Sequence, residues 1–86
     1  MAESPINPSA PEWPYEQVAA LLAEEIRAGK WTAGSLFATE RDLSVRFGVA
    51  RKTVRAALES LRADGLIYTI PRRGTFVEEP PASKNG

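Results

Sequence analysis

The sequence predicts a small α+β fold that is mainly α, with three helices followed by a small β-hairpin. Apolar residues recur every three or four positions in three separate segments, which is the spacing of a helix with one buried face. Each of these segments ends at a glycine, a residue that readily adopts the left-handed conformation of a helix C-terminus. After the third glycine, short runs of β-branched and aromatic residues flank a turn, as in a hairpin.

The first helix is expected from Tyr15 to about Ala28. Val18, Leu22 and Ile26 continue the apolar face that Tyr15 begins. The glutamates of this segment lie largely off that face, so one side of the helix is expected to pack on a core and the other to meet solvent.

Two further helices are expected over residues 40–47 and from 51 to about 64, with only three residues between them. Thr39 and Asp42 have the spacing of a capping box at the start of the shorter helix. Ala50 stands where the following helix needs an N-cap, and it has no side-chain oxygen to supply one. Two helices joined by a short glycine-containing turn are typical of a helix-turn-helix.

The hairpin is expected to consist of strands 66–70 and 75–77, joined by the turn 71–74. Residues 34–37 could add a third short strand. A hairpin directly after a helix-turn-helix predicts a winged helix-turn-helix, in which the hairpin is the wing. Four large apolar residues outside the helices are expected in the core: Trp31, Leu36, Phe37 and Phe76.

Composition divides the chain into three parts. Residues 1–14 hold four prolines and little apolar content, which predicts a mostly disordered N-terminal arm. Residues 15–77 are expected to form the winged helix-turn-helix domain. Residues 78–86 are rich in proline, acidic and small polar residues and are expected to form a flexible tail or linker.

The chain of 86 residues has no cysteine and no histidine. It therefore lacks thiolate nucleophiles, imidazole bases and the usual zinc ligands, so neither an enzyme nor a metal or cofactor site is expected. No apolar run approaches the roughly 18 residues that a membrane span needs. Residues 1–13 lack the basic and apolar stretches of a signal peptide. These features favour a cytoplasmic protein that does not enter a membrane.

Charge is distributed unevenly, although the net charge of the whole chain is zero. Residues 1–26 carry five acidic residues and no basic one, whereas residues 41–73 carry eight basic and three acidic residues. Such segregation predicts one positively charged face, which suits a nucleic-acid partner.

The basic residues of the last two elements suit double-stranded DNA. In a helix-turn-helix the second helix enters the major groove with its N-terminal residues against the base edges. Arginine can donate two hydrogen bonds to one guanine there, while a basic hairpin tip can reach phosphates or the minor groove. The candidate residues lie in three segments of the chain: Arg41; Arg51, Lys52, Thr53 and Arg55; Arg72, Arg73 and Gly74.

The same charges have a second interpretation, as ordinary solvated surface residues. Arg46 follows Asp42 by four positions and Arg62 follows Glu59 by three, spacings that allow ion pairs within one helix. Arg55 could pair with Glu59 in the same way. The hairpin tip could likewise be a solubilising turn.

Residues 15–77 resemble the DNA-binding domain of the bacterial GntR (gluconate-repressor) family of transcription regulators. The resemblance needs no gap and rests on these stretches: Tyr15, Gln17 and Val18; 26–34; 39–43; 47–55; Leu58 and Leu61; 65–67; 73–77. It implies a regulator, usually a repressor, that binds a near-palindromic operator, often as a homodimer. It also implies DNA contacts by the following residues: Arg41, Arg51, Lys52, Thr53, Arg55, Arg73 and Gly74.

Three positions depart from the family pattern. Residues 37–39 are Phe-Ala-Thr where the family favours Leu-Pro-Ser, Ala50 replaces a serine or threonine, and Arg72 replaces a glycine of the wing. Family members normally carry a larger C-terminal domain that senses an effector, and this chain contains no effector-binding domain. We therefore expect either an isolated DNA-binding domain or a short stand-alone member.

The alternative function is a winged-helix protein–protein interaction module that does not bind DNA. Such a module would present an apolar or acidic face on its third helix. The basic segment 51–55 opposes that interpretation.

Overall fold

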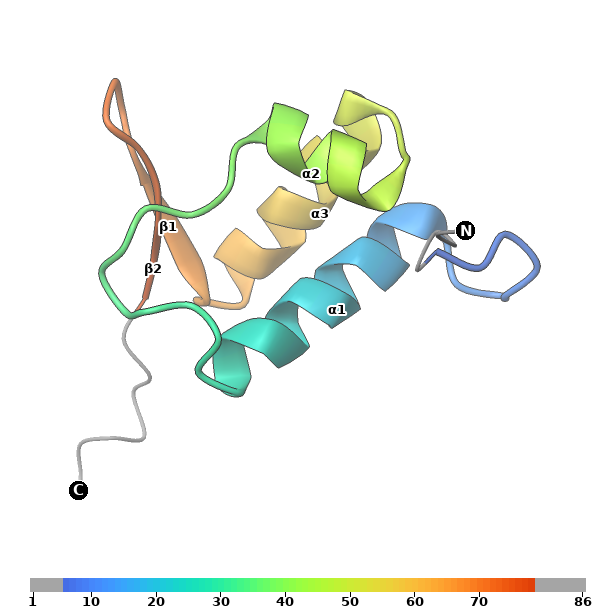
Figure 1. Cartoon of the computed structure of the whole chain (residues 1–86), viewed down its shortest axis with the longest axis horizontal. Helices are drawn as coiled ribbons and strands as arrows, with labels where there is room; N and C mark the ends of the chain where they lie inside the picture. Colours follow the sequence, from blue (N-terminus) through green and yellow to red (C-terminus); the bar gives the residue numbers. More distant parts are fainter. Residues whose placement is uncertain (1–5, 79–86) are drawn as a thin grey trace.

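The structure, a computed structural model, describes residues 6–78. Helices α1 (Pro14–Arg27), α2 (Glu40–Phe47) and α3 (Arg51–Ala63) are followed by strands β1 (Ile67–Ile70) and β2 (Gly74–Val77) (Figure 1). This is the predicted winged helix-turn-helix, and each boundary lies within one residue of its expected position. No helix among residues 6–78 is both long and apolar enough to cross a membrane.

The elements share one apolar core. Helix α3 lies between α1 and α2 and contributes one face to the core, while the hairpin covers the end where α3 finishes (Figure 1). The largest side chains with less than 2% exposure come from all three helices and both strands: Val18, Leu22, Leu43, Phe47, Val54, Leu61, Ile67 and Val77. Because every element supplies part of this core, the helices and the wing hold one another in place.

The ends of α2 follow the sequence prediction. The Thr39 hydroxyl accepts a hydrogen bond from the N–H of Asp42 at 3.0 Å, and the Asp42 carboxylate accepts one from the N–H of Thr39 at 3.5 Å. This is the capping box. Gly48 ends the helix with φ of 67°, a left-handed conformation that glycine adopts without strain. Ala50 precedes α3 without any side-chain cap, as expected.

Residues 6–13 fold back onto α1, which differs from the disordered arm expected over residues 1–14. Ile6 is only 7% exposed and belongs to the core. The Gln17 amide accepts a hydrogen bond from the N–H of Asn7 at 2.7 Å and donates one to its carbonyl at 2.9 Å. The burial of Ile6 and the hydrogen bonds of Asn7 each depend on one residue, so the average composition of residues 1–14 does not indicate them. Residues 1–5 and 79–86 lie outside the described residues.

The wing is an antiparallel hairpin in which Ile67 lies opposite Val77 and Ile70 lies opposite Gly74. The loop before α2 runs beside β2, and Leu36 forms an isolated bridge with Phe76 where a third strand was expected. Phe37 is buried, and Trp31 and Phe76 are half-buried. The prediction for Leu36 is wrong: its side chain is 59% exposed, because it lies at the sheet edge against the hairpin tip.

Candidate nucleic-acid interface

Five exposed cations gather on the side of the molecule opposite α1. The start of α2, the first turn of α3 and the hairpin tip all lie toward the upper edge of Figure 1, with α1 below them. None of the five side chains forms an ion pair with any residue in the described part of the chain. We call this set the basic surface: Arg41, Arg51, Lys52, Arg72 and Arg73.

The first turn of α3 exposes two cations for different reasons. Val54, Leu58 and Leu61 are buried, and Lys52 lies on the opposite side of the helix from them. Arg51 lies near the apolar face of the helix and is exposed at its first position. Thr53, also predicted as a contact, is half-buried. The helix has no acidic residue in its first turn and no side-chain cap, so its positive end adds to the charge of these side chains. This arrangement is suited to an anion such as a DNA phosphate.

Arg55, a predicted DNA contact, forms a two-pronged ion pair with Glu40 at the start of α2. Its Nε and Nη2 atoms donate to the two carboxylate oxygens, both at 3.0 Å. The hydrogen bond from Arg55 lowers the pKa of Glu40 and raises that of Arg55 itself. The pair fixes α2 against α3, and it occupies one edge of the guanidinium. Glu40, and not Glu59, is therefore the partner of Arg55.

The two ion pairs expected within single helices do not form. Arg46 donates to Glu25 of α1 and lies over the Phe47 ring, 4.7 Å from its centroid. Asp42, its expected partner, accepts at the cap of α2. Arg62 donates from Nε to the Thr69 hydroxyl of β1 at 3.1 Å, where an ion pair with the preceding glutamate was expected. In both cases the partner lies on another element, which helical spacing cannot reveal.

The hairpin tip depends on two unusual backbone conformations. Arg72 has φ of 70°, and it is the one non-glycine residue among 6–78 with a positive φ. Gly74 has φ of 122°, and a Cβ there would lie 3.0 Å from Cδ1 of Leu36. The Arg73 N–H closes the turn onto the Ile70 carbonyl at 2.9 Å. Gly74 is therefore favoured mainly for its conformation, since Leu36 is exposed and its side chain can move away from an added Cβ.

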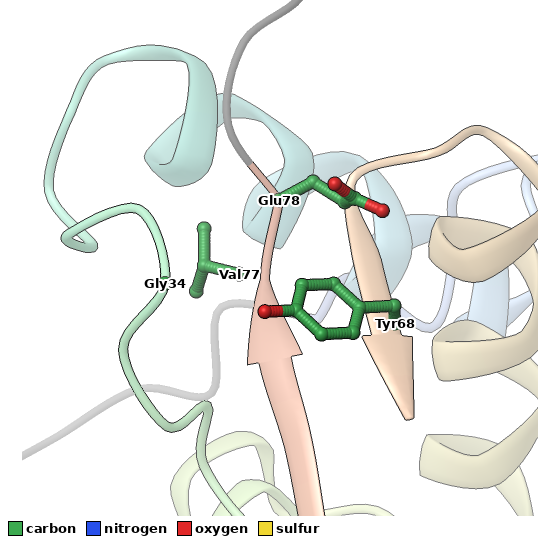
Figure 2. A pocket seen from close by; sticks show the side chains of 4 residues that line it. All are labelled: Gly34, Tyr68, Val77 and Glu78. Carbon is green, nitrogen blue, oxygen red and sulfur yellow. The ribbon is translucent and has the colours of Figure 1, made fainter. Parts of the chain in front are cut away.

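Two hollows flank the hairpin, and they differ in charge. One, of about 370 Å³, lies between the start of α2, α3 and the wing, and both Arg62 and Arg73 line it. The other, of about 480 Å³, has no basic residue among the lining residues that the structure describes: Gly34, Tyr68, Val77 and Glu78 (Figure 2). In Figure 2 the Tyr68 ring extends from β1 with its hydroxyl toward β2.

Tyr68, to which the sequence assigns no role, stacks on Phe76 with ring centroids 5.7 Å apart. Among residues 6–78 no group of three acidic, histidine or cysteine side chains is placed to hold a metal ion.

Comparison with known proteins points to one family. The model of the bacterial regulatory proteins of the gntR family matches residues 14–77. The chain is 37% identical over 75 residues to the HTH-type transcriptional repressor NagR of Bacillus subtilis (strain 168), which covers 87% of this chain and 31% of that protein. It is 38% identical over 72 residues to the histidine utilization repressor of Klebsiella aerogenes, covering 84% and 30%. The chain thus spans about a third of the length of these relatives.

A solved structure supports the same relationship. The crystal structure of AraR(DBD) in complex with operator ORE1 superposes with a TM-score of 0.74 at 32% identity, covering 90% of this chain and 94% of that one. The elements that carry the basic surface are therefore elements of a fold that has been solved on an operator.

Proposed function

Because this chain belongs to the GntR family of bacterial regulatory proteins, we propose that it binds double-stranded operator DNA and regulates transcription. We further propose that it acts as a repressor in the cytoplasm. Both curated relatives described above carry the word repressor in their names, which supports this direction of control. The proposal gives the chain no catalytic role.

The basic surface is the observation that carries this proposal. It combines exposed cations from the two helices of the helix-turn-helix with exposed cations from the wing, and the parts of these elements that carry them lie on one side of the molecule (Figure 1). A helix-turn-helix places the first turn of its second helix in the major groove, where base edges distinguish one sequence from another. The wing then lies beside the groove at the flank of the site.

The residues of the basic surface have different proposed tasks. Arg51, at the first position of α3, donates two hydrogen bonds to a guanine. Lys52 and Arg41 neutralise phosphates and contribute affinity without sequence preference. Arg72 and Arg73 reach the flank, where a narrow A·T-rich minor groove attracts arginine. Arg55 acts mainly through its ion pair with Glu40.

A near-palindromic operator bound by two copies is part of the proposal. Two copies related by a twofold axis would place two α3 helices in successive major grooves, about one helical turn apart. The copies pair on the DNA, and each supplies one basic surface to one half-site.

A protein–protein interaction module without DNA binding remains the competing function. A docking surface is typically depleted of charge at its centre and enriched in aromatic residues. The first turn of α3 has the opposite character, with Arg51 and Lys52 exposed. This observation favours DNA.

A comparison of two neighbouring substitutions tests the proposal. Operator sequences are first selected from a random duplex pool, and dissociation constants are then measured on the selected and on a random duplex. Arg51→Ala is expected to cost about 1–3 kcal/mol on the selected duplex and less on the random one, whereas Lys52→Ala weakens both equally. Lys30→Ala, which removes an exposed cation outside the basic surface, is the matched control and leaves both constants unchanged. Failure of the parent chain to bind any duplex would favour the docking module.

A further inference from the structure

A short hydrogen-bond network joins α3 to the wing. The Nε atom of Arg62 donates to the Thr69 hydroxyl at 3.1 Å, and this hydroxyl lies 3.0 Å from that of Thr75 on the opposite strand. Arginine can only donate, so the Thr69 hydroxyl accepts from Arg62, and either threonine hydroxyl can be the donor in the bond between Thr69 and Thr75. The network therefore runs from α3 through both strands of the hairpin.

The position of this hydrogen-bond network within the wing lets it hold the half of the hairpin nearer the tip. The base of the hairpin is anchored by burial, since Ile67 and Val77 are 1% and 2% exposed. The half nearer the tip is exposed at Thr69 and Ile70. On its other side, the N–H of the buried Phe37 donates to the Thr75 carbonyl at 2.7 Å. In the described part of the chain, the bond from Arg62 is the one side-chain hydrogen bond between α3 and the hairpin.

We propose that Arg62 is a positioning residue that fixes the wing tip relative to the first turn of α3, through its bond to Thr69 and Thr75. The wing cations Arg72 and Arg73 lie just beyond the paired threonines. Holding that pair to α3 sets where these two cations meet the DNA while α3 occupies the groove. This inference rests on the proposed DNA-binding function.

The surroundings of Arg62 suit positioning better than direct phosphate binding. Arg62, Glu40 and Arg73 line the same hollow between α2, α3 and the wing. The carboxylate of Glu40 attracts the guanidinium of Arg62 and repels a phosphate that approaches the hollow. This favours Arg62 remaining at the lining of the hollow over its binding a phosphate there. A charged donor makes the bond to Thr69 stronger than a bond between two neutral groups.

The first experiment measures wing position without DNA. The chain has no cysteine, so Glu59→Cys on α3 and Arg72→Cys at the tip can carry two spin labels for pulsed electron–electron distance measurement. Thr69→Val removes the acceptor with little change of shape and no change of charge. It is expected to broaden the distance distribution, as is Arg62→Met, while Thr69→Ser restores the narrow one. An unchanged distribution in both Thr69→Val and Arg62→Met would overturn the proposal.

The second experiment measures the consequence for binding, on the unlabelled chain and a selected duplex. Thr69→Val is expected to weaken binding about threefold to tenfold, the range for loss of one intramolecular hydrogen bond of typical net strength. In an Arg72→Ala/Arg73→Ala background the same substitution should change nothing, because the wing no longer carries cations to position. An equal loss in both backgrounds would mean that Thr69 acts elsewhere and would overturn the proposal. Failure of the parent chain to bind DNA would refute the proposed function and leave the distance result to stand alone.

Discussion

Arg72 holds a conformation that its side chain disfavours. Its φ of 70° lies in the left-handed region, which costs an L-residue with a side chain roughly 1 kcal/mol. The family pattern has glycine at this position of the wing, and glycine would adopt the conformation without that cost. Arg72 thus brings a second cation to the tip at the expense of fold stability, a combination that is common at functional sites.

We expect Arg72→Gly to raise the free energy of unfolding by about 0.5–1 kcal/mol, because it removes the backbone strain of the folded state. Glycine also increases the entropy of the unfolded chain, which offsets part of this gain. Arg73→Gly removes the same charge from a residue with ordinary φ, so it should lower stability by a similar amount. Urea denaturation of both variants measures the difference. Midpoints that shift in the same direction would show that charge, and not backbone strain, governs the stability of the tip.

At the scale of elements, α1 and α2 are tied together by Glu25. Its carboxylate accepts hydrogen bonds from Arg46 of α2 and, at 3.0 Å, from the indole of Trp31. The hydrogen bond from Arg46 is the main reason that the pKa of Glu25 lies below its ordinary value of 4.5, and Trp31 adds to it. The contact stabilises the junction only while Glu25 is ionised.

Folding lowers the pKa of Glu25, so its contribution to stability is complete above about pH 4.5 and is lost as the pH falls through the folded-state value. We expect Glu25→Gln to be less stable than the parent by up to about 1 kcal/mol at pH 7, and the difference to be smaller at pH 3. Glu24→Gln, an exposed neighbour on the same helix, is the control and should follow the parent at both values. Denaturant midpoints at several pH values provide the test. A deficit of Glu25→Gln that persists undiminished at pH 3 would assign the effect to packing.

The sequence predicts what is periodic or local, and it misses contacts between elements. The helices, their glycine ends and the cap at Thr39 all depend on neighbours within a few positions, and each prediction is confirmed. Arg46, Arg55 and Arg62 instead meet partners on other elements, 7 to 21 positions away. Ile6 is missed for the same reason, because its burial depends on how the chain returns to α1.

The candidate site was predictable to the extent that it depends on exposure. Lys52 lies opposite the apolar stripe of α3 and must project to solvent, whereas Arg51 lies near that stripe and is exposed at the first position of the helix. Arg55 follows the same period, yet Glu40 occupies one edge of its guanidinium. Spacing therefore predicts where a cation lies but not whether it is already paired.

At the scale of the whole molecule, the chain has no net charge and still presents a charged face. Five of its eleven acidic residues lie in the first 26 positions, three of them on α1, and the elements that carry the basic surface lie on the opposite side. Such a molecule has a strong dipole, which orients it toward a polyanion before contact and adds to the rate of association.

The slope of log K against log salt should reflect the number of cations on the basic surface that bind DNA. Binding of a cation to a DNA phosphate releases condensed counterions, and log K falls with log salt by roughly 0.9 for each phosphate neutralised. Five cations without an ion pair among residues 6–78 therefore predict a slope of about −4 to −5 on a short random duplex that accepts one copy. Arg72→Ala/Arg73→Ala should make the slope shallower by about 2, whereas Lys30→Ala, outside the basic surface, should leave it unchanged. Fluorescence anisotropy over a range of salt concentrations measures each slope. A parent slope shallower than about −1 would contradict DNA binding through this surface, because that few released ions cannot come from five phosphate contacts.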